Sequence, residues 1–369
     1  MTQRRSVLGL FTLMSSAAMH TATAQIPAGL RDLSTVRIVE SDSLFLARPI
    51  EITLGPGGHV FVTEAKEARV LDIGPSGRIE RAFGRQGRGP GEFVSPSTLA
   101  VGGDSLLIVF DRGQRRVTYV RLPSWTLGPI VLLPEAWPPT MRVVNGAVLV
   151  RSYDWDSKTS LAQLDSAGTL VDREGVIPEI GLKYPMLIQG AFPRAVFTVI
   201  GAKVFAMFEV SPSLYEWERG SRTAREIDVP APRRRGVRTS LFEQMLQNPN
   251  SPRMGELIYD RSIPFALEAI TDSLLAIVTM DLTITKDSKT VVYHLTLVDV
   301  QRRRVCPDLL IPLSRTRMPV TDPAPLAAVR GDTLVILDEV ADAHGEPGPA
   351  LRRFRIEPSR CGQWIALPQ

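Results

Sequence analysis

"AFGRQGRGPGEFVSP", residues 82–96, is the stretch of sequence that decides the fold. It contains four glycines and two arginines between Gly84 and Gly91, a composition seen both in phosphate-binding loops and in turn-rich joints between strands. A phosphate-binding loop needs Gly-Lys-Ser/Thr at the start of a helix, whereas Pro90 and then an apolar strand follow here. The dinucleotide fingerprint also needs a helix after it. The stretch therefore predicts a structural joint, with Phe93 packed between two sheets.

The surrounding chain repeats one pattern six times. Each repeat reads as an apolar strand, a tight turn, a second apolar strand and then an acidic residue. The six final acids are Glu64, Asp111, Asp154, Glu209, Asp281 and Glu339. Successive acids are 47, 43, 55, 72 and 58 residues apart, and the shorter spacings match propeller blades of four antiparallel strands. The sequence therefore predicts an all-β, six-bladed β-propeller of four-stranded antiparallel blades.

The first repeat also carries a family resemblance. Residues 58–96, "GHVFVTEAKEARVLDIGPSGRIERAFGRQGRGPGEFVSP", are similar to the NHL-repeat-like propellers of the TolB-like superfamily, here of a bacterial exported type. The shared pattern is Gly, strand, acid, Arg-Val, strand, Phe-Gly, a glycine-rich turn and Gly-Pro-Gly-Glu-Phe. The second repeat matches less completely, and later repeats keep only the hydrophobic pattern. The resemblance implies the fold, while propellers as a class carry many different functions.

The repeats predict a single propeller domain over residues 25–369. Its blades are expected at about 49–93, 96–134, 140–176, 195–230, 266–313 and 326–367. The ring should be closed by an N-terminal strand at 35–40, either beside residues 350–356 or outside residues 363–367, the expected fourth strand of blade six.

A helical insertion is predicted after blade four, over residues 230–263. Within it, Ser240 and Glu243 form a capping box before an apolar run, and residues 251–260 suggest a second short helix. The insertion is either a lid or partner-docking element, or a packing decoration.

The N-terminus has the pattern of an export signal. Arg4 and Arg5 precede an apolar stretch at 6–19, and Ala22-Thr23-Ala24 fits a cleavage site, which predicts a signal peptide at 1–24. An N-terminal membrane anchor is the alternative, although the apolar stretch is short for one. No later segment reads as transmembrane. We expect a periplasmic or extracellular protein that is a monomer.

Charge and cysteine content limit the partners. The net charge of +4 falls to +2 without the signal, and the basic runs at 233–235 and 302–304 are short, so we expect no nucleic-acid partner. Two cysteines, Cys306 and Cys361, favour a disulfide in an exported chain. Their expected places, before the outer strands of two different blades, argue against pairing. The sequence leaves this question open.

The loops between blades and between second and third strands should share one face at the mouth of the channel. We expect the six acids to accept backbone N–H groups there rather than bind a cation. Glu51, on an inner strand, is the metal candidate; it resembles an early Glu of calcium-dependent lactonase propellers, whose other ligand motifs are missing. A rim carboxylate is the favoured interpretation of this residue. His59, His294 and His344 share no short ligand spacing, and no nucleophile elbow is present.

The predicted ligand-binding residues are Arg85, Arg88, Arg151, Tyr153 and Trp155, although Trp155 can instead pack against the next blade. The sequence favours a non-catalytic propeller that binds a ligand or protein through the channel face, without a cofactor. The alternative is a metal-dependent hydrolase, lactonase or lyase that uses Ca²⁺ or another divalent cation at the channel carboxylates, Glu51 foremost.

Overall fold

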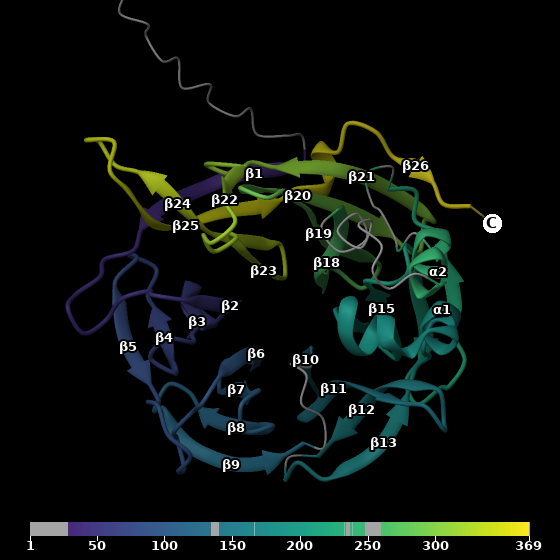
Figure 1. The fold of residues 1–369 in the computed structure, drawn as a ribbon, viewed down its shortest axis with the longest axis horizontal. Helices are drawn as coiled ribbons and strands as arrows, with labels where there is room; N and C mark the ends of the chain where they lie inside the picture. Colours follow the sequence, from purple (N-terminus) through teal and green to yellow (C-terminus); the bar gives the residue numbers. More distant parts are fainter. Residues whose placement is uncertain are drawn as a thin grey trace, which may run out of the picture.

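Six antiparallel sheets surround a central axis in the computed structural model (Figure 1). The structure describes residues 29–133, 140–165, 167–231, 233, 237, 239–247 and 260–368. The all-β, six-bladed propeller predicted from the repeats is confirmed. The predicted signal peptide at 1–24 lies outside the described residues.

The blades follow one another along the chain, each beginning with its innermost strand. Blade one contains β2 Pro49–Leu54, β3 Val60–Glu64, β4 Arg69–Ile73 and β5 Ile79–Phe83. Blade two contains β6 Pro96–Gly102, β7 Leu106–Asp111, β8 Arg116–Arg121 and β9 Thr126–Leu132. Blade three contains β10 Met141–Val144, β11 Ala147–Asp154, β12 Thr159–Leu164 and β13 Leu170–Glu174. Blade four contains β14 Ala195–Ile200, β15 Lys203–Phe208, β16 Leu214–Glu218 and β17 Arg225–Ile227.

The last two blades depart from the simple repeat. Blade five contains β18 Asp260–Ala269, β19 Leu274–Ile284, β20 Ser288–Asp299, β21 Arg304–Ile311, β22 Arg317–Pro319 and β26 Ile365–Ala366. Blade six contains β23 Leu326–Arg330, β24 Thr333–Ala341, β25 Pro347–Ile356 and β1 Leu30–Arg37. Blade five therefore starts at 260, six residues before the predicted 266, and has six strands rather than four.

The hydrophobic core lies between neighbouring blades, because each sheet has apolar residues on both faces. Phe93 shows how one such interface is built. It is fully buried in a cluster with Phe61 and Val109, from blades one and two, which confirms its predicted packing between sheets. Gly84 has a φ of +85°, and a Cβ there would lie 2.4 Å from the Phe93 ring. Only glycine fits this position, so the glycine-rich stretch is shaped by the blade interface.

The ring is closed by the N-terminal strand. β1 pairs with β25 in antiparallel register, from Leu30 opposite Ile356 to Arg37 opposite Ala350. The expectation that residues 363–367 complete blade six is wrong. Since β1 already occupies the free edge of β25, the C-terminal segment crosses to blade five, where β26 pairs with β21.

This crossing explains a disulfide that the predicted strand order argued against. Cys306 lies on β21, and Cys361 lies in the segment that leads to β26, so both belong to the edge of blade five. Their Cα atoms are 6.3 Å apart and the two residues form a disulfide. The argument against pairing was wrong because it assigned Cys361 to blade six.

Two short helices lie against blade four (Figure 1). α1 spans Glu179–Lys183 and α2 spans Thr239–Gln247, where the capping box predicted a helix. Tyr184 and Phe242 meet edge to face at 5.2 Å, and Leu241 and Phe242 are buried in the core of this region. These contacts support the packing interpretation of the insertion. The second helix predicted at 251–260 lies outside the described residues, except for Asp260, which begins β18.

The remaining helical segments are short: 3₁₀ turns at Pro56–Gly58 and Pro358–Arg360, and a π-helical turn at Leu187–Ala191. Among the helices of the described ranges, none has the length and apolar character needed to cross a membrane.

Replacing Cys361 by Ser is expected to lower the free energy of unfolding by about 2–4 kcal/mol, because the bridge constrains a long loop in the unfolded chain. The two cysteines are 55 residues apart in sequence. Urea unfolding of C361S and of the C306A/C361S double variant measures this effect. The wild type under reducing conditions is the control. Equal unfolding midpoints with and without the bridge would contradict the prediction.

Candidate functional site

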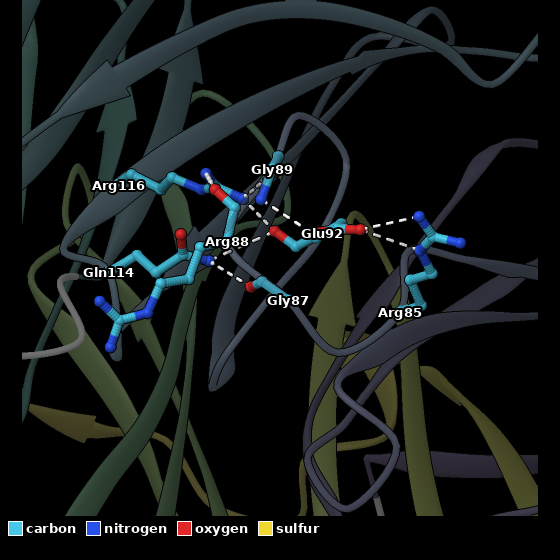
Figure 2. Close-up of polar contacts among 7 residues, drawn as sticks. All are labelled: Arg85, Gly87, Arg88, Gly89, Glu92, Gln114 and Arg116. Atoms are coloured by element: carbon cyan, nitrogen blue, oxygen red, sulfur yellow. Dashed lines mark hydrogen bonds and ion pairs between the residues drawn. The ribbon is translucent and has the colours of Figure 1, made fainter.

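The glycine-rich loop is held by side chains of blade two (Figure 2). The buried Arg116 donates to the carbonyl oxygens of Arg88 at 3.1 Å and Gly89 at 2.9 Å, and also to that of Glu92. The Gln114 amide donates to the Glu92 carbonyl at 3.3 Å. A phosphate-binding loop turns its N–H groups toward an anion. Here the carbonyl oxygens turn toward a cation of the protein itself, so the loop is a structural joint.

Arg85 and Arg88 lie on this loop and do not line the channel cavity. Arg85 is 81% exposed and forms an ion pair with Glu92 at 2.8 Å. The Gly89 N–H donates to the same carboxylate at 2.8 Å, and this bond, followed by the bond from Arg85, lowers the pKa of Glu92. The guanidinium of Arg88 points away from the loop, and no described residue pairs with it (Figure 2). These two predicted binding residues are therefore separate from Arg151.

Backbone N–H groups donate, as predicted, to four of the six acids: Glu64, Asp111, Asp154 and Glu209. Asp281 differs, because it accepts from the Ser262 hydroxyl and lies 3.1 Å from His294. Glu64 accepts the backbone N–H groups of Arg48 and Glu67, each at 2.7 Å. Asp111 accepts the N–H of Val94 at 2.7 Å. Each of these two acids thus joins the loop that enters its blade to the turn between second and third strands. This pattern confirms that both kinds of loop lie on one face.

In blade six the same role has moved by one residue. Asp338, rather than the predicted Glu339, is buried and accepts the Ser314 N–H at 2.7 Å. Glu339 is 39% exposed and pairs with Arg315 at 2.5 Å. The prediction of Glu339 was therefore wrong. Successive residues of a strand point to opposite faces, and on β24 the buried position falls on Asp338 rather than on Glu339.

A cavity of about 700 Å³ occupies the central channel and is lined by the first strands of all six blades. Its charged lining is unequal: six arginines face two glutamates. The arginines are Arg48, Arg112, Arg142, Arg151, Arg194 and Arg330, and the glutamates are Glu51 and Glu268. A channel with low-dielectric walls and one excess sign of charge concentrates its electric field, here in favour of anions.

Two of these arginines form contacts between different blades inside the channel. Arg142 of blade three forms an ion pair with Glu268 of blade five and donates to the Phe197 carbonyl of blade four at 2.9 Å. Arg330 of blade six donates to the Gly103 carbonyl of blade two at 2.8 Å. Both lie toward the end of the channel where first and second strands turn. They join blades that are far apart in sequence.

Glu51 is a channel carboxyl group whose pKa is strongly shifted. Burial raises its pKa to about 7, against the opposing effects of the Arg194 charge and of the Leu99 N–H, which donates at 3.4 Å. The Arg194 guanidinium lies 4.0 Å from the Glu51 carboxylate, and 24% of the Glu51 side chain is open, toward the channel. Near neutral pH this carboxyl group is about half protonated.

Arg48 and Arg194 carry the positive charge at the mouth. Arg48 precedes β2 and is exposed, and no other described residue forms a hydrogen bond or ion pair with its guanidinium. Arg194 precedes β14 and stacks over the Phe265 ring at 4.4 Å from the ring centre. A guanidinium held flat on an aromatic ring keeps its donor edge available for a carboxylate or phosphate.

The predicted cluster of Arg151, Tyr153 and Trp155 is divided between two places. Arg151 is buried and lines the cavity, and its guanidinium lies over the Tyr153 ring at 5.2 Å. Tyr153 and Trp155 are 6.2 Å apart and pack against the core between blades three and four. The packing interpretation of Trp155 is thus the one that the structure supports.

Sequence reasoning missed most of the channel arginines. Arg48 and Arg194 stand alone in the sequence and belong to no motif, and Arg112 directly follows the acid of the second repeat. The available signal was their position, since each lies directly beside the start of an inner strand or the acid that faces it. Reading the charged residues at these positions in all six repeats would have found the cationic mouth.

Comparisons with solved structures find the same fold in proteins of very different sequence. A protein of Bacteroides fragilis that is thought to be exported matches with a TM-score of 0.62 and 15% identity, over 90% of this chain and 97% of its own. A DUF4221 family member from Bacteroides vulgatus matches with a TM-score of 0.55 and 8% identity, over 90% and 99%. Virginiamycin B lyase from Staphylococcus aureus reaches a TM-score of 0.47 at 10% identity, over 89% and 100%.

The two Bacteroides matches show the fold alone, and the NHL-repeat assignment remains a resemblance. No protein-family model matches the sequence, and no curated protein matches it either.

Replacing Arg116 by Ala is expected to lower the free energy of unfolding by at least about 2 kcal/mol, because three carbonyl oxygens lose a charged donor. The matched control is Arg88→Ala, which removes an exposed arginine from the same loop and should change stability by less than about 0.5 kcal/mol. Urea unfolding of both variants measures the difference. Equal effects would show that Arg116 does not hold the loop.

Replacing Glu51 by Gln is expected to stabilise the protein relative to wild type as the pH rises. The folded-state pKa of about 7 lies above the ordinary value of 4.5, so the native state holds a proton that the unfolded chain releases. This contribution to wild-type stability is complete below about pH 4.5 and is lost as the pH passes about 7.

The glutamine side chain of the E51Q variant has no proton to lose. The difference in unfolding free energy between E51Q and wild type should therefore shift by about 2–3 kcal/mol in favour of E51Q between about pH 5 and about pH 8. Urea unfolding at each pH measures it, with Glu67→Gln on an exposed turn of the same blade as the control. A difference that stays constant with pH would contradict the prediction.

Proposed function

We propose that this chain is an exported, non-catalytic binding protein that takes a small anionic ligand into the mouth of its central channel. The observation that carries the proposal is the lining of the channel, with six arginines against two glutamates. A cavity of about 700 Å³ is within the range of small-molecule sites. The export signal predicted at the N-terminus and the Cys306–Cys361 disulfide support a periplasmic or extracellular location.

The two glutamates do little to cancel the positive charge. Glu268 is already paired with Arg142, and Glu51 is about half protonated near neutral pH because burial raises its pKa to about 7. The half-protonated Glu51 therefore neutralises Arg194 only in part. Arg194 keeps positive charge available to an anion that enters the mouth. Binding of an anion should in turn favour the protonated form of Glu51, since two neighbouring negative charges repel each other.

The proposed contacts are Arg48, Arg194 and Arg151. Arg48 is exposed at the mouth, and Arg194 is oriented by the Phe265 ring. Planar guanidinium groups bind carboxylate and phosphate oxygens in pairs, which makes these two classes of ligand the best match. Tyr153 and Trp155 contribute by supporting Arg151 rather than by touching the ligand. Arg85 and Arg88, outside the channel, remain candidates only for contacts with a larger partner.

The metal-dependent alternative fits the channel less well. Ca²⁺ is bound by six to eight oxygen ligands. Each carboxylate that lines the described cavity has an arginine beside it, Arg194 for Glu51 and Arg142 for Glu268. A divalent cation would have to compete with these guanidinium groups. The donor set therefore does not suit a divalent cation.

Citrate and inorganic phosphate are the probes for the proposal. We expect either probe to raise the melting temperature, with an effect that shrinks as salt is added. The Arg48→Ala/Arg194→Ala variant should bind the stabilising probe at least about tenfold more weakly by calorimetry, because each lost charged contact is worth about 1.5–3 kcal/mol.

The matched control is Arg85→Ala/Arg88→Ala, which removes the same charge from the outer loop. Equal weakening in both double variants would mean nonspecific attraction and would contradict a channel site. A stoichiometric divalent ion that copurifies and is lost in Glu51→Gln would instead favour the metal-dependent alternative.

A further inference from the structure

Three side chains that could bind a metal meet at the end of blade one that faces away from the channel mouth. His59 directly precedes β3, Asp72 lies near the end of β4, and Glu80 is the second residue of β5. The turn between β3 and β4 lies on the mouth side, so the opposite ends of these strands lie on the other face. One potential ligand atom from each residue lies within 4.8 Å of the others.

The protein balances the negative charge of this group only in part, through the charge of Arg81, which lies opposite Asp72 in the β4–β5 pairing. The His59 imidazole is 2.7 Å from the Asp72 carboxylate, and Asp72 has no other hydrogen-bond or ion-pair partner among the described residues. Glu80 makes no hydrogen bond or ion pair within the described ranges. Two carboxylates therefore converge on a single imidazole, an arrangement that an added cation would stabilise.

The backbone leaves room for Glu80 to turn inward. A Cβ on residue 74 would lie 2.0 Å from the Glu80 Oε1 atom, so the glycine at this position allows the side chain to fold back over the turn. Glu80 therefore reaches toward Asp72 and His59 instead of extending freely into solvent. Asp72 is buried, so its position is fixed by packing, and it holds the His59 imidazole by a hydrogen bond. His59 is 30% exposed, so the cluster remains open to solvent on the side of His59 and Glu80.

We propose that His59, Asp72 and Glu80 form a zinc-binding site on the face opposite the channel mouth. One imidazole and two carboxylates are ligands that Zn²⁺ accepts at tetrahedral sites, with water in the fourth position. Neighbouring positive charge should keep the affinity moderate, since Arg353 donates to the Gly58 carbonyl at 3.0 Å. The site does not depend on the anion site in the channel.

Calorimetric titration of the chelator-treated full chain with ZnCl₂ tests the proposal. We expect one equivalent of Zn²⁺ per chain and an affinity at least about tenfold weaker in Glu80→Gln and in His59→Ala, since loss of even an outer-shell partner costs that much. Glu80→Gln separates the two roles of the cluster. It removes a ligand and leaves the His59–Asp72 hydrogen bond in place, so a purely structural pair predicts no change.

The matched control is His344→Ala, which removes an imidazole from an exposed loop of blade six and should leave Zn²⁺ binding unchanged. Cobalt substitution gives a second readout, because a tetrahedral site produces visible absorption bands that Glu80→Gln should abolish. No binding of Zn²⁺ by the wild type, or equal binding by wild type and Glu80→Gln, would overturn the proposal.

Discussion

Closure of the ring is the constraint on which the rest of this structure depends. Each blade has apolar residues on both faces and can bury them only against two neighbours, so the first and last blades must meet. The pairing of β1 with β25 supplies this contact by adding the N-terminal strand to the last blade. The same pairing occupies the edge that the C-terminal strand would otherwise use. β26 and the Cys306–Cys361 disulfide consequently protect the edge of blade five.

A closed ring also decides which charged groups become neighbours. Arg48, Arg194 and Glu268 belong to blades one, four and five, and only closure around an axis brings them to one cavity. Arg142 and Arg330 then join non-adjacent blades by hydrogen bonds to the backbone carbonyls of Leu267 and Gly103. The guanidinium groups of Arg142 and Arg330, which hold the blades together, lie toward one end of the channel. The guanidinium of Arg48 lies at the mouth, where it is available to a ligand.

The fold could be predicted from the sequence because its signal is local and repeated. The acids that end the second strands bind backbone groups within their own blade or its entrance loop, so their spacing reports the blades directly. The choice of edge for residues 363–367 is not local, because it depends on whether β1 has filled β25. The channel site shares this difficulty, since isolated arginines acquire a common function only through closure. Of the charged lining residues, only Glu51 and Arg151 were identified from the sequence, Glu51 because an acid on an inner strand is conspicuous.

The glycine-rich stretch shows why amino-acid composition does not reveal whether a loop binds an anion or a cation. Glycines let a backbone approach any partner closely, whether that partner is an anion or a cation. The direction of the peptide dipoles decides between the two. In this loop the carbonyl oxygens of Arg88, Gly89 and Glu92 converge on the Arg116 guanidinium, so the cation that the loop binds is part of the protein (Figure 2). Anions are favoured instead where guanidinium groups face open space, and in this propeller that place is the channel mouth.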